Sequence, residues 1–254
     1  MNELNELERE EDNEVSERLI KSKSRVQKHG EVFTPRSMVK IMLDQPEVKK
    51  ACTELETTFL EPAAGEGVFL VEILKRKLKM VSKKFNETLK QYENYALLAL
   101  TTIYGIELLE DNAQICTQNL FEVFSDMYTE QILFHSGKKS KKVTESAKVI
   151  ISANIAQGNF LTRESLDGKD IVFSEWYPNY KKNSIDVMRT EYTLTEILLK
   201  ETKSKGLMYS HKEKPIQISL FDSPEDHEEM LNKYRYFSVP IVDVYKEEME
   251  VYDG

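Results

Sequence analysis

The segment at residues 57–69 constrains the fold of this sequence more than any other. It begins with TTFLE, a short β-branched and apolar run that is typical of a buried strand. A turn with Gly65 and Gly67 follows, and an apolar periodicity then predicts a helix to about Lys84. A strand, a glycine turn and a helix in this order indicate one unit of a parallel α/β sheet. Ligands of such sheets bind beyond the carboxyl ends of the strands, so we expect a ligand at this turn.

The residue types around the turn narrow the class of ligand. The dinucleotide fingerprint GxGxxG would need a third glycine where Leu70 stands. The predicted strand ends in Glu61, whose carboxylate repels a pyrophosphate but accepts hydrogen bonds from an ammonium group or from hydroxyls. A cationic or neutral nucleoside therefore fits better than a dinucleotide. The alternative is a glycine turn that only closes a βα unit.

A second acid, Glu107, stands near the end of the next predicted strand, Thr102–Leu108. In nucleotide-binding folds of this shape, an acid at this position accepts hydrogen bonds from the ribose hydroxyls. Alone, Glu107 would be read as an exposed strand-end residue. Because a glycine turn ends the preceding strand, the pair of features favours a nucleoside site.

The rest of the chain alternates between predicted helices and strands. Helical spacing and start signals predict helices at 35–50, 66–84, 92–101 and 111–124. We expect a polar, lysine-rich loop at residues 136–146 and a strand at Asp170–Phe173, whereas 148–155 fits either a helix or a strand. Parallel neighbours need a crossover of a dozen or more residues. This order therefore predicts an α/β fold with a mostly parallel sheet flanked by helices.

Three segments carry a family resemblance: GEVFTP at 30–35, EPAAGEGVF at 61–69 and YGIE at 104–107. Together they resemble the S-adenosylmethionine-binding motifs of DNA adenine-N6 methyltransferases, in the order seen in the gamma class and in type I modification subunits. The resemblance covers about residues 28–178. It implies a Rossmann-like methyltransferase fold and S-adenosylmethionine as the cofactor.

The resemblance also implies a set of cofactor-binding residues. Thr34 and Pro35 would meet the methionine end of the cofactor, Glu107 would bind the ribose, and Asn159 with Phe160 would flank the adenine. Asn159 stands where the family usually has Asp. The implied cofactor-binding positions are Phe33, Thr34, Pro35, Glu61, Pro62, Ala63, Gly65, Gly67, Phe69, Glu107, Asn159 and Phe160.

The catalytic motif departs from the family pattern. The family places (D/N/S)PP(Y/F/W) at the end of its fourth strand, where the motif positions the target amine and stacks on the extruded base. Here Ser174 and Tyr177 keep the two end positions, while Glu175 and Trp176 replace both prolines. We expect Ser174, Glu175, Trp176 and Tyr177 to form the catalytic site. The alternative is that Trp176 and Tyr177 are core or turn aromatics of a degenerate site.

Charge is unevenly distributed along the chain. The formal net charge is −9, which by itself argues against a nucleic-acid partner. Residues 1–20 carry −6 and residues 222–254 carry −7, so the stretch between them carries +4. That stretch contains runs of lysine and arginine at 21–28, 75–84 and 138–142, each of which is either a solvated face or a contact to nucleic acid.

Composition and length bound the remaining expectations. The chain has two cysteines, an acidic N-terminus without an apolar signal region, and no long apolar stretch. These features predict a cytoplasmic protein with no membrane association. We expect an N-terminal segment at 1–27, a methyltransferase core at 28–180 and a small C-terminal appendage at 181–254. We expect DNA as a partner. Because the appendage is short for a target-recognition domain, we also expect a specificity or restriction subunit as a partner.

A short motif lies in the predicted appendage. The segment QISLF at 217–221 is similar to the peptide that binds the bacterial sliding clamp, with Gln217, Leu220 and Phe221 as anchors. The alternative is a short strand with buried apolar residues.

Two functions from different classes follow from the sequence. The first is an S-adenosylmethionine-dependent DNA adenine-N6 methyltransferase of a bacterial or phage restriction–modification or mobile-element system. The second is a catalytically silent methyltransferase-fold subunit that binds cofactor or DNA in a regulatory role. A methyltransferase acting on RNA or on protein glutamine is a variant of the first.

Overall fold

The computed structural model describes residues 34–209 and 234–251. Of these described residues, those up to Ile41 belong to a first unit and those from Met42 onward belong to a second. Thr34 and Pro35 belong to the first unit and directly precede helix α3 (Arg36–Leu43). The sheets and the remaining described helices belong to the second unit.

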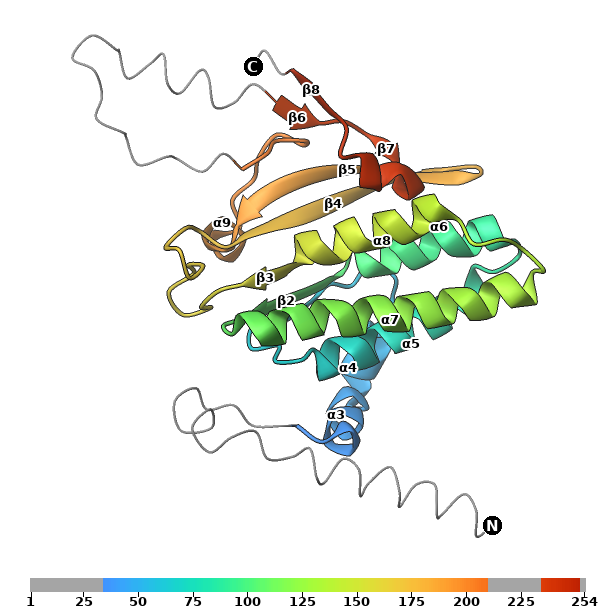
Figure 1. Ribbon diagram of the computed structural model, residues 1–254, viewed down its shortest axis with the longest axis horizontal. Coiled ribbons are helices and arrows are strands. Elements are labelled where there is room, and N and C mark those ends of the chain that lie inside the picture. Colours follow the sequence, from blue (N-terminus) through green and yellow to red (C-terminus); the bar gives the residue numbers. More distant parts are fainter. Residues whose placement is uncertain (1–33, 210–233, 252–254) are drawn as a thin grey trace. The chain divides into compact units, whose positions relative to one another are not determined.

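The second unit alternates helices with short strands and then continues into antiparallel strands (Figure 1). Its elements are α4 (Pro46–Ala51), β1 (Phe59–Glu61), α5 (Val68–Lys84), α6 (Leu89–Leu100), β2 (Ile103–Glu107), α7 (Glu110–Phe134), α8 (Lys141–Asn154), β3 (Ile155–Gln157), β4 (Val172–Lys181), β5 (Ser184–Thr193), α9 (Leu194–Leu199), β6 (Tyr234–Tyr236), β7 (Val239–Pro240), the 3-10 helix η1 (Ile241–Lys246) and β8 (Met249–Val251). Among the described residues, no helix is both long and apolar enough to cross a membrane.

The first sheet is parallel and has the order β1-β2-β3. Leu60 pairs with Tyr104, and Ile106 pairs with Ala156. Each crossover contains two helices, α5 and α6 before β2 and α7 and α8 before β3. A crossover is needed because the chain must return to the amino end of the sheet before it forms a parallel neighbour. This arrangement confirms the expected mixed α/β class with a parallel sheet flanked by helices.

Helix α8 resolves one ambiguity and corrects one boundary. The expected loop at 136–146 is wrong from Lys141 onward, because α8 begins there, and the ambiguous stretch 148–155 is helical to Asn154. Buried Val143, Ala147 and Ile150 recur at helical spacing, and this burial outweighs the lysine-rich start. The chain enters β3 directly at Ile155, whose φ and ψ of −110° and 110° are already extended.

The second sheet is antiparallel, with the order β4-β5-β7. The expected parallel strand at Asp170–Phe173 is therefore wrong: β4 begins at Val172, continues to Lys181 and pairs with β5 along its whole length. The tight turn at Lys182–Asn183 joins two long β-prone segments, which makes hairpin pairing the local choice. Pro178 is compatible with β4 because this is an edge strand, where a missing N–H need not break a ladder.

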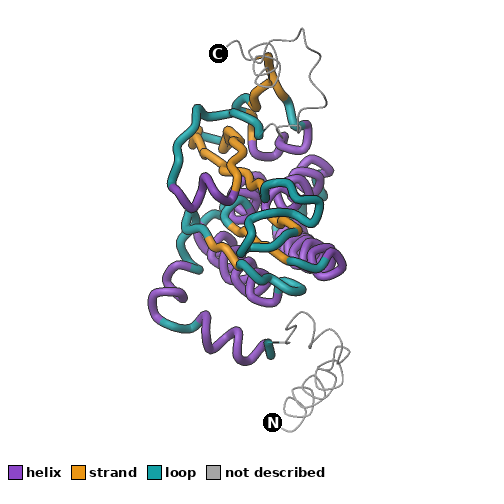
Figure 2. The backbone as a smooth tube through the Cα atoms, turned by 90° about the vertical axis from the view of Figure 1, so that its left-hand side faces the viewer, coloured by secondary structure: helices purple, strands orange, loops and turns teal. Residues whose placement is uncertain are grey.

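The first sheet is packed against helices and against a later part of the chain. Helices α5, α7 and α8 contact its strands. Ile106 of β2 packs in an apolar cluster with Ile171, Phe173 and Leu194. The Tyr104 hydroxyl donates a 2.9 Å hydrogen bond to the Ser174 carbonyl and so ties β2 to β4. In Figure 2, the loops that follow the parallel strands face the viewer.

A buried lysine closes the turn that precedes β1. Lys77 on α5 is fully buried, and its ammonium donates to the carbonyl oxygens of Glu54, Leu55 and Thr57 at 2.8, 3.1 and 2.8 Å. Burial lowers the pKa of Lys77 to about 8. The three carbonyls satisfy all the donors of the ammonium, so the side chain acts as a cap for residues 54–57.

We expect Lys77→Met to lower the free energy of unfolding by about 2–3 kcal/mol, because it leaves carbonyls without a donor. Lys79→Met, an exposed position on the same helix, is the matched control and should change stability by less than about 0.5 kcal/mol. Urea unfolding followed by circular dichroism measures both. Equal effects of the two variants would contradict the capping role.

Candidate cofactor-binding edge

The turn after β1 begins at a partly buried acid. Glu61 is the last residue of β1, and Pro62 and Ala63 after it are exposed. Burial raises the pKa of Glu61, while a hydrogen bond from the backbone N–H of Ala63 acts in the opposite direction. Glu61 thus presents a carboxylate at the carboxyl end of the sheet with little other support from the protein.

The two glycines of the turn are required for different reasons. Gly65 and Gly67 have φ values of +55° and +82°, which residues with a side chain rarely adopt. A Cβ on Gly67 would lie 2.5 Å from the Sγ of Cys116, so α7 packs directly against the turn there. A Cβ on Gly65 would meet nothing within 4 Å. The backbone at Gly65 therefore borders open space that a ligand can occupy.

Glu107 connects the turn to the second strand. This carboxylate is only 8% exposed. It accepts 2.8 Å and 3.0 Å hydrogen bonds from the N–H groups of Gly65 and Leu109, and a longer one of 3.4 Å from the Asn112 amide. Its two oxygens thus fix the glycine turn and the start of α7 at the same time.

Helix α7 supplies support that the sequence analysis did not single out. The Asn119 amide donates a 2.9 Å hydrogen bond to the Glu66 carbonyl, and Cys116 packs under Gly67. Burial, assisted by the negative charge of Glu107, raises the pKa of the Cys116 thiol to about 12. Cys116 is therefore a packing residue in its neutral form. Polar residues on the inner face of the helix that follows β2 are the signal that could have found this support.

The third strand brings Asn159 and Phe160 to the same edge. The Gly158 N–H donates a 2.9 Å hydrogen bond to the Glu107 carbonyl, which joins the end of β3 to the end of β2. The Asn159 side-chain oxygen accepts from the Leu161 N–H at 2.9 Å, and Phe160 packs against the apolar cluster. Glu61, Gly65, Gly67, Glu107 and Asn159 thus share one edge, as the sequence predicts.

Several predicted positions bear a different relation to this edge. Phe69 is in the first turn of α5 and is partly buried. Thr34 and Pro35 belong to the first unit, and their role stays a prediction. Phe33 and the Gln217, Leu220 and Phe221 anchors lie outside the described residues.

The predicted catalytic residues lie within β4 and not in a loop. Ser174 is 1% exposed, and its hydroxyl accepts a 2.7 Å hydrogen bond from the Arg189 Nε. Trp176 is 7% exposed, and its indole N–H donates to the Asn154 side-chain oxygen at 3.0 Å. Asn154 directly precedes β3 and so marks the amino end of the parallel sheet. Trp176 is therefore at the opposite end of this sheet from Gly65.

Glu175 and Tyr177 are more accessible than their neighbours on β4. Glu175 is exposed and accepts a hydrogen bond from the Tyr177 hydroxyl, which also lies 3.2 Å from the Tyr192 hydroxyl. Burial and the hydrogen bond to Glu175 raise the pKa of Tyr177 well above its usual range. The catalytic roles of these four residues stay predictions.

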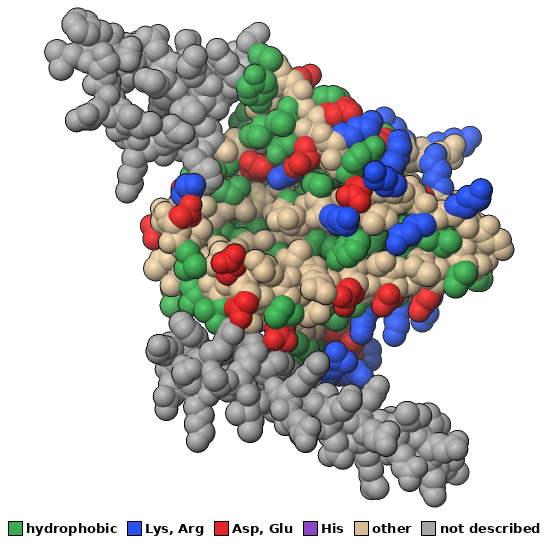
Figure 3. All heavy atoms as spheres, in the orientation of Figure 1, with side chains coloured by type: hydrophobic (Ala, Val, Ile, Leu, Met, Phe, Trp, Pro, Cys, Tyr) green, Lys and Arg blue, Asp and Glu red, His purple; other side chains and the backbone are tan. Residues whose placement is uncertain are grey.

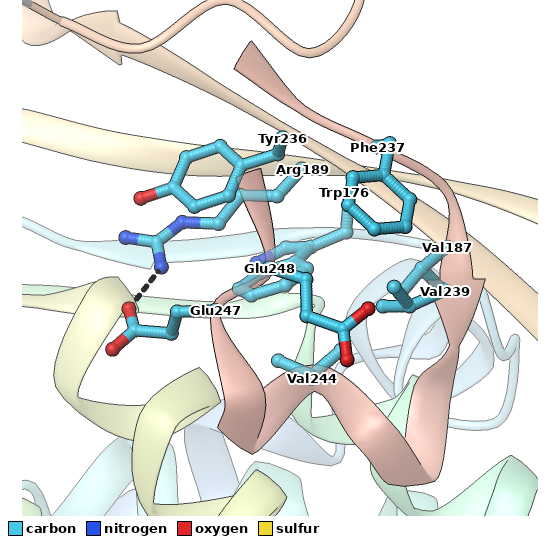
Figure 4. Close-up of a pocket in the computed structure, with 9 residues that line it drawn as sticks. All are labelled: Trp176, Val187, Arg189, Tyr236, Phe237, Val239, Val244, Glu247 and Glu248. Carbon is cyan, nitrogen blue, oxygen red and sulfur yellow. Dashed lines mark hydrogen bonds and ion pairs between the residues drawn. The ribbon is translucent and has the colours of Figure 1, made fainter. Parts of the chain in front are cut away.

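Arg189 organises the buried side of β4 (Figure 4). Its guanidinium lies over the Tyr236 ring at 4.6 Å and over the Trp176 ring at 5.6 Å. It also pairs with Glu191 at 2.9 Å and with Glu247 at 2.8 Å. A cavity of about 20 Å³ beside these groups has room for about one water molecule. Ser174 and Trp176 are thus integrated into a packed ion-pair network.

The residues at the described edge fit the nucleoside cofactor that the resemblance implies, but the role of Glu107 differs from the one expected. Glu61 offers a carboxylate, and Gly65 offers open space beside the backbone. Among the described residues, the N–H₂ group of the Asn159 amide donates to no partner and is available to a ligand. Glu107 already accepts from three donors, so its first role here is to position the turn.

A comparison with protein families identifies the class to which this fold and edge belong. The model of the family described as N-6 DNA Methylase matches residues 13–206, which is more than half of the chain. The chain therefore belongs to the DNA adenine-N6 methyltransferase family. No curated protein matches the chain, and no solved structure does.

We expect Glu107→Gln to lower the free energy of unfolding by about 2–4 kcal/mol, because the amide N–H₂ must face a backbone donor on one side. Glu110→Gln, an exposed position three residues later, is the matched control with an expected change below about 0.5 kcal/mol. Thermal and urea unfolding measure both. Hydrogen exchange at Gly65 should accelerate in Glu107→Gln alone; unchanged protection there would contradict the assignment.

Proposed function

We propose that the carboxyl edge of β1, β2 and β3 binds S-adenosylmethionine, within a Rossmann-like arrangement, for methyl transfer to adenine N6 in DNA. The observation that carries this proposal is the convergence of Glu61, the glycine turn and Asn159 around Glu107 in a member of this family. We further propose a restriction–modification or mobile-element context, with a specificity or restriction subunit as partner.

Each residue of the edge has a chemical task in this proposal. The Glu61 carboxylate accepts hydrogen bonds from the ammonium group or the hydroxyls of the cofactor. Gly65 lets the ligand approach the backbone closely, and the Asn159 amide can donate to an adenine edge. Glu107 holds the turn in the shape that binds, and the bound cofactor supplies an electrophilic methyl group.

A second candidate function is a cofactor-binding subunit that transfers no methyl group by itself. One observation favours it: the Ser174 hydroxyl and the Trp176 indole are both engaged within the fold, and Trp176 is at the amino end of the parallel sheet. A target amine held by these residues would be far from a methyl group held beside Gly65. Under this candidate, a partner subunit supplies the groups that position the target base.

The raised pKa of Glu61 gives cofactor binding a pH dependence. A protonated Glu61 no longer attracts an ammonium group, so affinity should fall as the pH falls through the raised pKa of this carboxyl. Glu61→Gln should weaken binding at neutral pH by about ten- to a hundredfold and flatten this dependence. Calorimetric titrations with the cofactor at several pH values test this, with Glu110→Gln as control. An affinity for the unmodified protein that is constant across acidic pH would contradict the role of Glu61.

Transfer is tested with tritiated cofactor and unmethylated bacterial DNA. We expect label in the DNA, lost in Glu61→Gln together with cofactor binding. Tyr177→Phe and Glu175→Gln should lower transfer by at least about tenfold while cofactor affinity stays within about twofold. The reason is that groups which position the target amine affect the rate of transfer and not the binding of the cofactor. Asn179→Ala, exposed on the same strand, is the control. Cofactor binding without transfer would favour the second candidate.

A further inference from the structure

Six exposed lysines gather at the end of the second unit that lies away from the glycine turn. We name this group the lysine end. It consists of Lys138, Lys139, Lys141, Lys142, Lys181 and Lys182. The first four come from the connection between α7 and α8 and from the first turn of α8, and the last two from the end of β4 and its hairpin turn.

Contacts through η1 and β7 bring these two segments together. Lys142 pairs with Asp243 of η1 at 2.9 Å. The residue before η1, Pro240 of β7, pairs with Asp186 of β5, and Asp186 forms an ion pair with Lys181. Figure 3 shows lysine and arginine side chains gathered at one end of this face of the molecule. The cluster is thus a product of the tertiary structure, because some 40 residues separate its two parts in the sequence.

The lysine end is not neutralised by the described part of the protein. Only Lys142 and Lys181 have ion-pair partners there, so Lys138, Lys139, Lys141 and Lys182 lack a carboxylate partner among the described residues. The first turn of α8 contains no acid and two of the lysines, although a helix start disfavours positive charge. The like charges of these neighbouring lysines repel one another, and an anionic chain that binds across the lysines relieves this repulsion.

The distance from the glycine turn matches the repeat of a nucleic-acid duplex. Helix α7 starts beside Glu107 and ends next to the lysine end, and its 25 residues span about 37 Å at 1.5 Å per residue. One turn of B-form DNA is about 34–36 Å long. A duplex that extends from the cofactor-binding edge to the lysine end therefore covers about one helical turn.

We propose that the lysine end anchors the phosphate backbone of DNA, at a surface separate from the cofactor-binding edge. Lysines act as point charges toward phosphates and read no base sequence, so the anchor sets position and affinity without specificity. The inference deepens the proposed function and rests on DNA being the substrate. It assigns the contact to a surface distinct from the predicted catalytic residues.

Two matched triple variants test the anchor in the full-length protein. The first is Lys138→Gln with Lys139→Gln and Lys182→Gln, all in connecting segments. The second is Lys50→Gln with Lys79→Gln and Lys200→Gln, which removes the same charge from exposed positions on or next to α4, α5 and α9. Fluorescence anisotropy with a duplex of about 30 base pairs, about three helical turns, measures affinity over a range of salt concentrations.

Loss of three phosphate contacts should reduce the slope of log affinity against log salt by about 2.7 and weaken binding at low salt by at least about tenfold. The second variant should change the slope by less than about 1. Cofactor affinity, measured in parallel, should be unchanged in both, so that failure of the anchor is distinguishable from failure of the cofactor site.

Three outcomes would overturn the anchor. Equal losses in the two variants would mean that net charge and not this surface determines binding. An unchanged slope in the first variant would show that phosphates do not contact these lysines. Tighter binding of polyglutamate than of the duplex at equal charge concentration, with this preference lost in the first variant, would indicate an acidic polypeptide as the partner of this surface.

Discussion

The buried carboxylate of Glu107 is the interaction on which the candidate site depends. A buried carboxylate is costly unless donors satisfy it, and here the donors are the backbone of the glycine turn and the start of α7. One residue therefore fixes the positions of β1, β2 and α7 relative to one another, and the carbonyl of the same residue extends the arrangement to Gly158 after β3. The left-handed backbone at Gly65 and Gly67 persists because these contacts hold it.

The other half of the fold is organised around Arg189. Its guanidinium satisfies Ser174 and two glutamates while it stacks on aromatic rings from β4 and β6. An arginine so enclosed requires each of these partners, because an unpaired charge in that environment would be strongly destabilising. The consequence for function is that Ser174 and Trp176 contribute to the stability of the second sheet, at the end of the molecule away from the glycine turn.

Local patterns predicted the βα units well and the later region poorly. The strand at 57–61, the helix after Gly67 and the strand at 102–108 follow from periodicity and from glycine positions, and the structure has all three within two residues of the expected bounds. The strand at 170–173 was extended past its expected end because ten consecutive pairs with β5 outweigh any local stop signal. The start of α8 was obscured by its lysines, although Val143 and Ala147 already follow its buried face.

The sequence by itself determined the family and the pattern of strand, glycine turn and strand-end acid at the sheet edge. These are local features that can be recognised without knowledge of the packing around them. Only the tertiary structure decided that Glu107 holds the turn, since its partner Gly65 is 42 positions away. Only the tertiary structure decided that the segment with Ser174 is an antiparallel strand and not the expected parallel one. It also brought the lysines of α8 close to those of the β4–β5 turn. Strand pairing and long-range ion pairs decide these points, and neither leaves a periodic signal in the sequence.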